Sequence, residues 1–156
     1  MALSGYDYGP DSFAQLLIAK FYPERTDKES AIIRDYLKAH LIEFDRVSFS
    51  VRVGKGATPD PDHLPAIQRA TVYSSQKRID VVAWQGNQVF LIEAKSIVGY
   101  AVMGQLLLDR HLWLEDYPDS PEPSLVAIGR TSDPDSLRGL SSHGVDVFLY
   151  DAPVTE

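Results

Sequence analysis

The chain has 156 residues, of which 44% are hydrophobic, and a formal net charge of −7. It contains no cysteine, which excludes disulfides and thiolate metal sites and is compatible with the cytoplasm. No run approaches the roughly 20 apolar residues of a membrane span, and the N-terminus lacks a secretion-signal pattern. We therefore expect a single domain over residues 1–156, cytoplasmic and without a membrane partner.

The first third of the chain is predicted to be mostly helical. Residues 1–11 contain glycine and proline among tyrosines and are expected to be irregular. A short helical pattern over 12–21 ends before Pro23. Thr26 and Glu29 then match a capping box, which predicts a helix from there to about residue 44.

The next segment combines a strand with a long connection. Residues 46–54 alternate between apolar and polar side chains, which predicts a half-buried strand with all its valines on one face. Residues 55–76 form a proline-containing connection, with a short helix near 66–69, and connections of this length are often functional. Residues 46–78 carry six basic and two acidic side chains. This excess of positive charge fits either a nucleic-acid contact or a solvated loop.

The most informative stretch is a predicted hairpin. Two runs rich in β-branched residues, 79–84 and 89–94, are separated by a turn at Gly86-Asn87. In a two-residue turn Gln85 faces Gln88, and this register places Asp80 opposite Glu93. A three-residue turn would instead send the two acids to opposite faces of the hairpin.

The predicted register brings like charges together. Asp80, Glu93 and Lys95 share one face of the hairpin. The other face is expected to be apolar, formed by Ile79, Val81, Ala83, Phe90, Ile92 and Ala94. Opposed carboxylates about 5 Å apart repel each other, and a hard cation such as Mg²⁺ would relieve that repulsion. The alternative is a surface hairpin with a cross-strand salt bridge.

Asp80, followed after twelve residues by Glu93-Ala94-Lys95, resembles the motif of the PD-(D/E)XK nuclease superfamily, although Ile79 stands where the motif has proline. The resemblance implies a restriction-endonuclease-like fold with an α-β-β-β-α-β core. It also implies that Asp80, Glu93 and the carbonyl of Ala94 hold Mg²⁺ or Mn²⁺, and that Lys95 positions the attacking water.

The remaining elements agree with that core. Residues 98–115 predict a helix, 124–129 a strand buried on both faces, 133–143 a second helix and 145–150 a final strand. The expected fold is thus an α/β (α+β) mixed sheet flanked by helices, with a helix and a strand added to the core.

Two further site residues follow from the resemblance. Gln105 lies at the distance from Lys95 at which the RecB-like branch carries a glutamine, but Asp109 replaces the tyrosine of that branch. Glu29 is the candidate for an additional acid on the first core helix. Each has a plainer alternative: Gln105 as an ordinary amide at the border of a helix, and Glu29 as a residue that only closes the capping box.

Together these features predict a Mg²⁺- or Mn²⁺-dependent nuclease acting on nucleic acid, with DNA as the expected substrate. The expected nucleic-acid contacts are Arg52, Lys55, Arg69, Tyr73, Lys77 and Arg78. A non-catalytic nucleic-acid-binding or assembly protein of the same fold is the alternative. Assembly into a homo-oligomer or a larger complex remains open.

Overall fold

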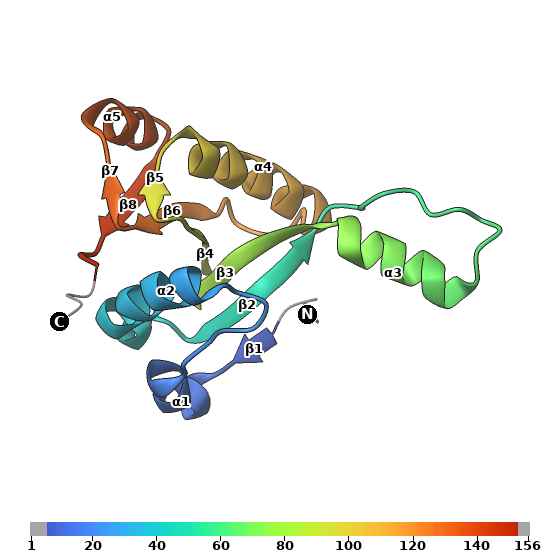
Figure 1. The fold of residues 1–156 in the computed structure, drawn as a ribbon, viewed down its shortest axis with the longest axis horizontal. Coiled ribbons are helices and arrows are strands. Elements are labelled where there is room, and N and C mark those ends of the chain that lie inside the picture. The colour runs from blue at the N-terminus through green and yellow to red at the C-terminus, as the bar shows by residue number, and fades with distance from the viewer. Residues whose placement is uncertain (1–5, 153–156) are drawn as a thin grey trace.

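The computed structural model describes residues 6–152. Its centre is a six-stranded mixed sheet with the strand order β1-β2-β3-β4-β6-β8, and helices cover both faces (Figure 1). Strands β1 to β4 run antiparallel to their neighbours, whereas β4, β6 and β8 are parallel. The predicted mixed α/β sheet is confirmed, and the elements α2-β2-β3-β4-α4-β6 follow the expected α-β-β-β-α-β order.

The bounds of the elements are as follows. The helices are α1 (Phe13–Ile18), α2 (Asp27–His40), α3 (Pro65–Ser75), α4 (Tyr100–Asp116) and α5 (Pro134–Ser142), with 3₁₀ turns η1 (Pro10–Ser12) and η2 (Leu41–Glu43). The main sheet contains β1 (Tyr6–Tyr8), β2 (Arg46–Val53), β3 (Lys77–Gln85), β4 (Gln88–Ala94), β6 (Ser124–Gly129) and β8 (Val145–Leu149). Strands β5 (Ile97–Val98) and β7 (Thr131–Ser132) form a separate parallel pair.

Two predicted boundaries differ from the structure. The N-terminal stretch expected to be irregular contains strand β1 and turn η1, while its residues 1–5 lie outside the described part. The short helix expected near 66–69 is the longer α3, and it projects away from the sheet without a buried residue (Figure 1). Helix α2 begins at the predicted capping box, in which Thr26 and Glu29 exchange hydrogen bonds.

The sheet separates two hydrophobic cores. The α2-side core contains buried residues of α2, including Ile33 and Leu37, and the α4-side core contains Leu106 and Trp113 of α4. Strands β4 and β6 contribute to both cores, which is why they read as nearly continuous apolar runs. The two cores fix the sheet on both faces, so the ends of its strands are held in place.

The predicted hairpin register is confirmed. Gln85 pairs with Gln88, and the ladder continues to the pair Val81–Ile92. Gly86 has a φ of +58°, as expected for a tight hairpin turn. Its backbone N–H donates to Asp45 at 2.6 Å, which ties the turn to the chain entering β2.

The faces of β2 and β3 differ from the prediction. Phe49 packs in the α2-side core, but Val51, two residues later, packs in the α4-side core. Strand β3 changes sides in the same way between Val81 and Ile79. The change coincides with Ser50, whose φ is +53°. The expectations of one apolar face including Ile79, and of a half-buried β2, are therefore wrong, because all of β2 after its first residue is buried.

Gly129, at the end of β6, controls the position of the segment that follows β4. A Cβ atom at this glycine would lie 2.2 Å from the carbonyl oxygen of Lys95 and 2.6 Å from Cγ2 of Val98. No L side chain fits there without a shift of the backbone at Lys95.

Gly129→Ala is therefore expected to lower the free energy of unfolding by roughly 1–3 kcal/mol, because the added methyl group overpacks a backbone contact. Urea denaturation measures this loss. The matched control is Gly139→Ala in α5, where a Cβ would meet nothing within 4 Å. That variant is expected to be neutral or more stable, and an equal loss in both variants would contradict the packing argument.

Candidate active site

The candidate site lies where the β3–β4 ladder ends. Beyond the pair Val81–Ile92, strand β4 continues to pair with β6 as far as Ala94. On the β3 side, the backbone N–H of Ala94 donates to Oδ2 of Asp80 at 2.9 Å. The Asp80 carboxylate thus takes the place of a backbone acceptor, and it is only 5% exposed.

Glu93 is buried next to Asp80. Its exposed fraction is 1%, and its Oε1 has no hydrogen-bond partner among residues 6–152. Burial raises the pKa of Glu93 well above its ordinary value, and the negative charges of Asp80 and Asp109 raise this pKa further. The two predicted acids therefore lie close enough to interact strongly.

Asp109 is a third buried carboxylate, contributed by α4. It is 3% exposed, and its Oδ2 also lacks a hydrogen-bond partner among the described residues. Burial raises the pKa of Asp109 to about 6, although a hydrogen bond with Glu93 acts in the opposite direction. In the sequence, Asp109 was noted only because it replaces the tyrosine of the RecB-like branch. Its spacing from the buried Leu106 and Trp113 was the signal, because it places an acid on the apolar side of the helix.

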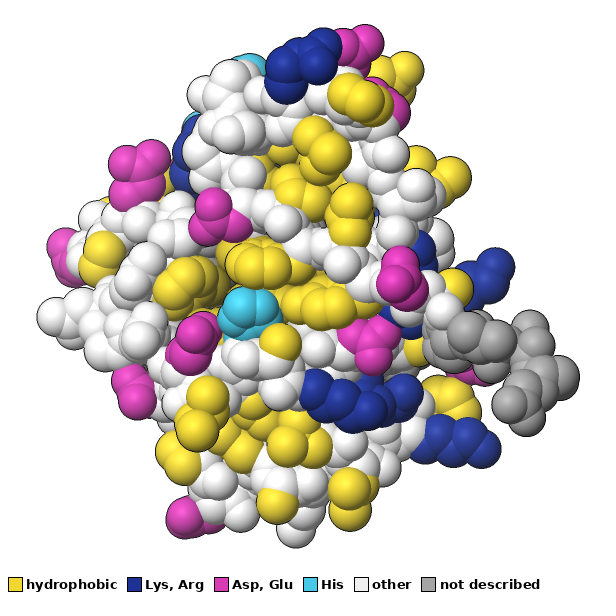
Figure 2. Space-filling view, turned by 90° about the vertical axis from the view of Figure 1, so that its left-hand side faces the viewer, with side chains coloured by type: hydrophobic (Ala, Val, Ile, Leu, Met, Phe, Trp, Pro, Cys, Tyr) yellow, Lys and Arg dark blue, Asp and Glu magenta, His cyan; other side chains and the backbone are white. Residues whose placement is uncertain are grey.

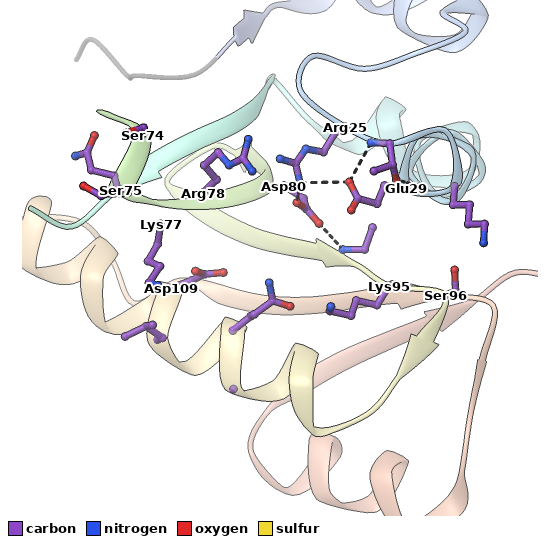
Figure 3. A pocket seen from close by; sticks show the side chains of 17 residues that line it. Arg25, Glu29, Ser74, Ser75, Lys77, Arg78, Asp80, Lys95, Ser96 and Asp109 are labelled. Atoms are coloured by element: carbon purple, nitrogen blue, oxygen red, sulfur yellow. Dashed lines mark hydrogen bonds and ion pairs between the residues drawn. The ribbon is translucent and has the colours of Figure 1, made fainter. Parts of the chain in front are cut away.

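Asp80 and Asp109 line an open cavity of about 750 Å³ (Figure 3). Among the predicted site residues, Glu29, Asp80, Ala94, Lys95 and Gln105 line this cavity. Side chains from the ends of α2 and β3, from the segment after β4 and from α4 thus surround one cavity, whereas Glu93 is not among the residues that line it. Lys95 and Asp109 enter the cavity from the opposite side to Asp80 in Figure 3.

The position of Glu29 is compatible with both predicted roles, as the residue that closes the capping box and as an additional acid near a metal. Its Oε2 accepts a hydrogen bond from the backbone N–H of Thr26 at 3.3 Å, which closes the capping box. The same oxygen lies 3.4 Å from Nη1 of Arg25, and the residue lines the cavity. Its role as a cap is confirmed, and its role near a metal stays a prediction.

Arg25 is a residue of the site that sequence reasoning missed. Its guanidinium forms an ion pair with Oδ1 of Asp80, and its side chain is 7% exposed. The residue precedes the N-cap of α2, Thr26, by one position and follows Pro23-Glu24, so no sequence pattern marked it as part of the site. Both oxygens of Asp80 are thus bonded, one to Arg25 and one to Ala94.

The predicted nucleic-acid contacts separate into three groups. Lys77 and Arg78 line the cavity. Lys55, Arg69 and Tyr73 are exposed on α3 or the connection before it, a segment that extends from the body of the molecule (Figure 1). The third group is Arg52 alone.

Arg52 does not fit the prediction of a nucleic-acid contact. It is 5% exposed, its guanidinium forms two hydrogen bonds with Glu24 at 2.9 and 3.0 Å, and it lies 3.9 Å from the centroid of the Tyr73 ring. The burial of β2 beyond Ser50 explains the difference, because it turns Arg52 toward protein instead of solvent.

Surface charge is mixed on the face of the molecule that Figure 2 shows. Figure 2 shows the side of the molecule on which β8 lies in Figure 1, and among the described residues acidic and basic side chains surround a hydrophobic centre there. This face therefore offers no continuous basic track for a phosphate backbone.

The residues of the cavity fit a hard divalent cation in an open site. Within residues 6–152, no three His, Cys, Asp or Glu side chains are arranged to hold a metal ion by themselves. Mg²⁺, however, is usually bound through one or two carboxylates and keeps several waters. Glu93 Oε1 and Asp109 Oδ2 are buried acceptors without a donor, and such oxygens are the ligands this ion prefers.

A scan against family models and a search of curated proteins gave no match. Among solved structures, the chain is similar to a repair endonuclease from Pyrococcus abyssi, with a TM-score of 0.47, 13% identity, and coverage of 86% of this chain and 50% of that one. It is also similar to the protein in an EndoMS–dsDNA complex, with a TM-score of 0.46, 14% identity, and coverage of 88% and 51%. The chain spans about half the length of these two proteins.

None of the helices in the described part of the chain is both long enough and apolar enough to cross a membrane.

The buried acids make a prediction about stability and pH in the metal-free protein. The folded-state pKa of Asp109 lies above its ordinary value of 3.8, at about 6. The folded protein therefore holds this proton more tightly than the unfolded chain, and stability falls as the pH rises through this interval. Asp109→Asn removes the effect and is expected to raise the free energy of unfolding at pH 7.5 by roughly 1–3 kcal/mol.

Urea denaturation in a chelator at pH 7.5 and pH 4 measures this difference, which should shrink at the lower pH. Asp119→Asn, at an exposed position, is the control and should show no such gain. If Asp109→Asn is less stable than wild type at pH 7.5, then burial of the charged Asp109 carboxylate does not lower the free energy of unfolding, and the prediction fails.

Proposed function

We propose that the protein is a Mg²⁺- or Mn²⁺-dependent nuclease that hydrolyses phosphodiester bonds, with DNA as its substrate. The observation that supports this most directly is the group of three buried carboxylates: Asp80 and Asp109 line the cavity together with Lys95, and Glu93 lies against both acids. Buried acids without sufficient partners are costly, and they occur where a bound cation or catalysis requires them.

In this proposal Asp80 and Glu93 hold the ion, together with the backbone carbonyl of Ala94. The bound ion would supply Lewis-acid activation of the phosphodiester. Asp109 lies against Glu93 and orients its carboxylate, as partners behind metal ligands commonly do. Its charge also favours occupation of the site by a cation.

Lys95 acts on the water and the phosphate. The residue directly follows β4, and its backbone N–H donates a hydrogen bond to the carbonyl oxygen of Ile128 at 3.0 Å. Its side chain is exposed and lines the cavity. It orients the water and stabilises the negative charge that develops on phosphorus-bound oxygens. The water oxygen forms one bond to phosphorus, one P–O ester bond breaks, and the leaving alkoxide takes a proton. Gln105 lines the cavity from α4 and would assist in orienting the water.

Asp80→Asn and Lys95→Ala are expected to reduce cleavage of DNA by roughly 100-fold or more, since each removes a group that acts in the transition state. The assay compares both variants with wild type on single-stranded, duplex and branched DNA in Mg²⁺ or Mn²⁺, with chelator as the blank. Lys28→Ala, at an exposed lysine that also lines the cavity, is the charge control. Cleavage that survives both substitutions would point to a contaminant or to another site.

The alternative is a binding or assembly protein that keeps the fold without catalysis. Calorimetry with Mn²⁺ separates the two. If the protein is a nuclease, the wild type is expected to bind Mn²⁺, and both Asp80→Asn and Glu93→Gln are expected to lose that binding. Uptake that is absent, or that is unchanged in both variants, would favour the non-catalytic alternative.

A further inference from the structure

Arg25 is the only basic side chain that the described structure pairs directly with Asp80. It also lies 3.4 Å from Glu29, and both residues line the cavity. Its Nε is buried and has no hydrogen-bond partner among residues 6–152. A buried guanidinium with an unsatisfied donor is expensive, so its position calls for a physical reason.

The segment that carries Arg25 is held on both sides. Glu24 accepts two hydrogen bonds from Arg52, at 2.9 and 3.0 Å, and this interaction lowers the pKa of the Glu24 carboxyl. The carbonyl of Pro23 accepts a hydrogen bond from the hydroxyl of Ser50 at 2.8 Å. On the other side, Thr26 caps α2. These contacts leave little freedom to the backbone that presents Arg25.

The same contacts join two strained residues. Among the described residues other than glycine, only Glu24 and Ser50 have positive φ, at +58° and +53°. Each such conformation costs on the order of 1–2 kcal/mol and persists only where the surroundings enforce it. Ser50 also marks the point at which β2 and β3 change sides next to Asp80. The two strained residues thus lie in the segment before α2 and in β2, the strand that pairs with the Asp80 strand β3.

The ion pair with Asp80 does not by itself explain why a charged Arg25 is buried here. Oδ2 of Asp80 already accepts from Ala94, and replacing the pair by neutral groups would avoid the burial of two charges. When Asp80 binds a cation, its attraction for Arg25 weakens, and the guanidinium then faces the cavity with several unused donors. A planar guanidinium matches the geometry of phosphate oxygens and binds them through two parallel hydrogen bonds.

We propose that Arg25 binds a non-bridging phosphate oxygen of the nucleic acid in the cavity, and that its ion pair with Asp80 holds it in place before substrate arrives. This inference rests on the proposed function, since it assigns a residue that binds the substrate of that site. Arg25 would act beside the other basic side chains that line the cavity, which are Lys28, Lys77, Arg78 and Lys95.

The test measures DNA binding separately from cleavage. A fluorescently labelled DNA oligonucleotide is titrated in Ca²⁺ at several salt concentrations, and its integrity is checked on a gel. Arg25→Gln is expected to weaken binding about 10-fold or more. It should also reduce the slope of log affinity against log salt by about one, because one phosphate contact is lost. Arg25→Lys keeps the charge, so it should preserve the slope and lose only part of the affinity.

Arg138→Gln is the matched control, because Arg138 is exposed on α5 and also pairs with a carboxylate, that of Asp135. A purely structural Arg25 would change thermal stability but leave the salt slope at the wild-type value. An effect of Arg25→Gln on DNA binding no larger than that of Arg138→Gln would overturn the proposal. The proposal would also be contradicted if Arg25→Lys folds well and binds DNA with wild-type affinity but changes the slope of log affinity against log salt.

Cleavage by wild type in Mn²⁺ distinguishes this proposal from the proposed function. If wild type cleaves DNA and the salt slope is independent of Arg25, only the assignment of Arg25 fails. If wild type does not cleave DNA but the slope depends on Arg25, the nuclease proposal fails and the phosphate contact stands.

Discussion

The structure depends on the burial of acidic side chains at the point where two strands separate. Asp80, Glu93 and Asp109 are at most 5% exposed, and only Asp80 has a basic partner, Arg25, in the described structure. Desolvation of this kind costs several kcal/mol for each charge unless a counterion or a proton compensates. In the metal-free protein the raised pKa values of Glu93 and Asp109 mean that these carboxyl groups hold their protons up to a higher pH than they do in the unfolded chain. The two hydrophobic cores must provide the stability that the acids remove.

The end of the β3–β4 ladder makes this burial possible. Strand β4 stays paired with β6 up to Ala94, so its backbone is fixed on one side. On the other side Asp80 accepts the hydrogen bond that a β3 carbonyl would otherwise accept. The Asp80 side chain therefore replaces a backbone group in the hydrogen bonding of the sheet. The β4 backbone fixes the position of its carboxylate more firmly than rotamer preference alone would. Gly129 reinforces this arrangement, because its missing side chain lets β6 approach Lys95.

Local patterns predicted the hairpin well. The Gly86-Asn87 turn gave the register correctly, since a two-residue turn permits only one set of facing pairs. The capping box likewise gave the start of α2. These features depend on neighbouring residues alone, so one sequence suffices to predict them.

Features that depend on tertiary contacts escaped prediction. The positive φ of Ser50 is not typical of serine, and it turned Ile79 and Arg52 to faces that simple alternation does not give. Arg25 reaches Asp80, 55 residues away, through a segment held by other long-range contacts. Asp109 was visible as an acid on the apolar side of α4, but only the fold brings it to Glu93.

The charge of the site implies an order of events for the proposed reaction. Four carboxyl groups, those of Glu29, Asp80, Glu93 and Asp109, lie in or next to the cavity, and five basic side chains line it: Arg25, Lys28, Lys77, Arg78 and Lys95. Without a cation, the three buried acids can be charged only at the cost of burying negative charges beside one another, and they can be neutral only by holding protons. A divalent ion removes both problems, because it displaces those protons and offsets the remaining negative charge. In the proposed reaction the acidic net charge of −7 is no obstacle to nucleic-acid binding, since the ion and the basic side chains that line the cavity would attract phosphate at the site itself.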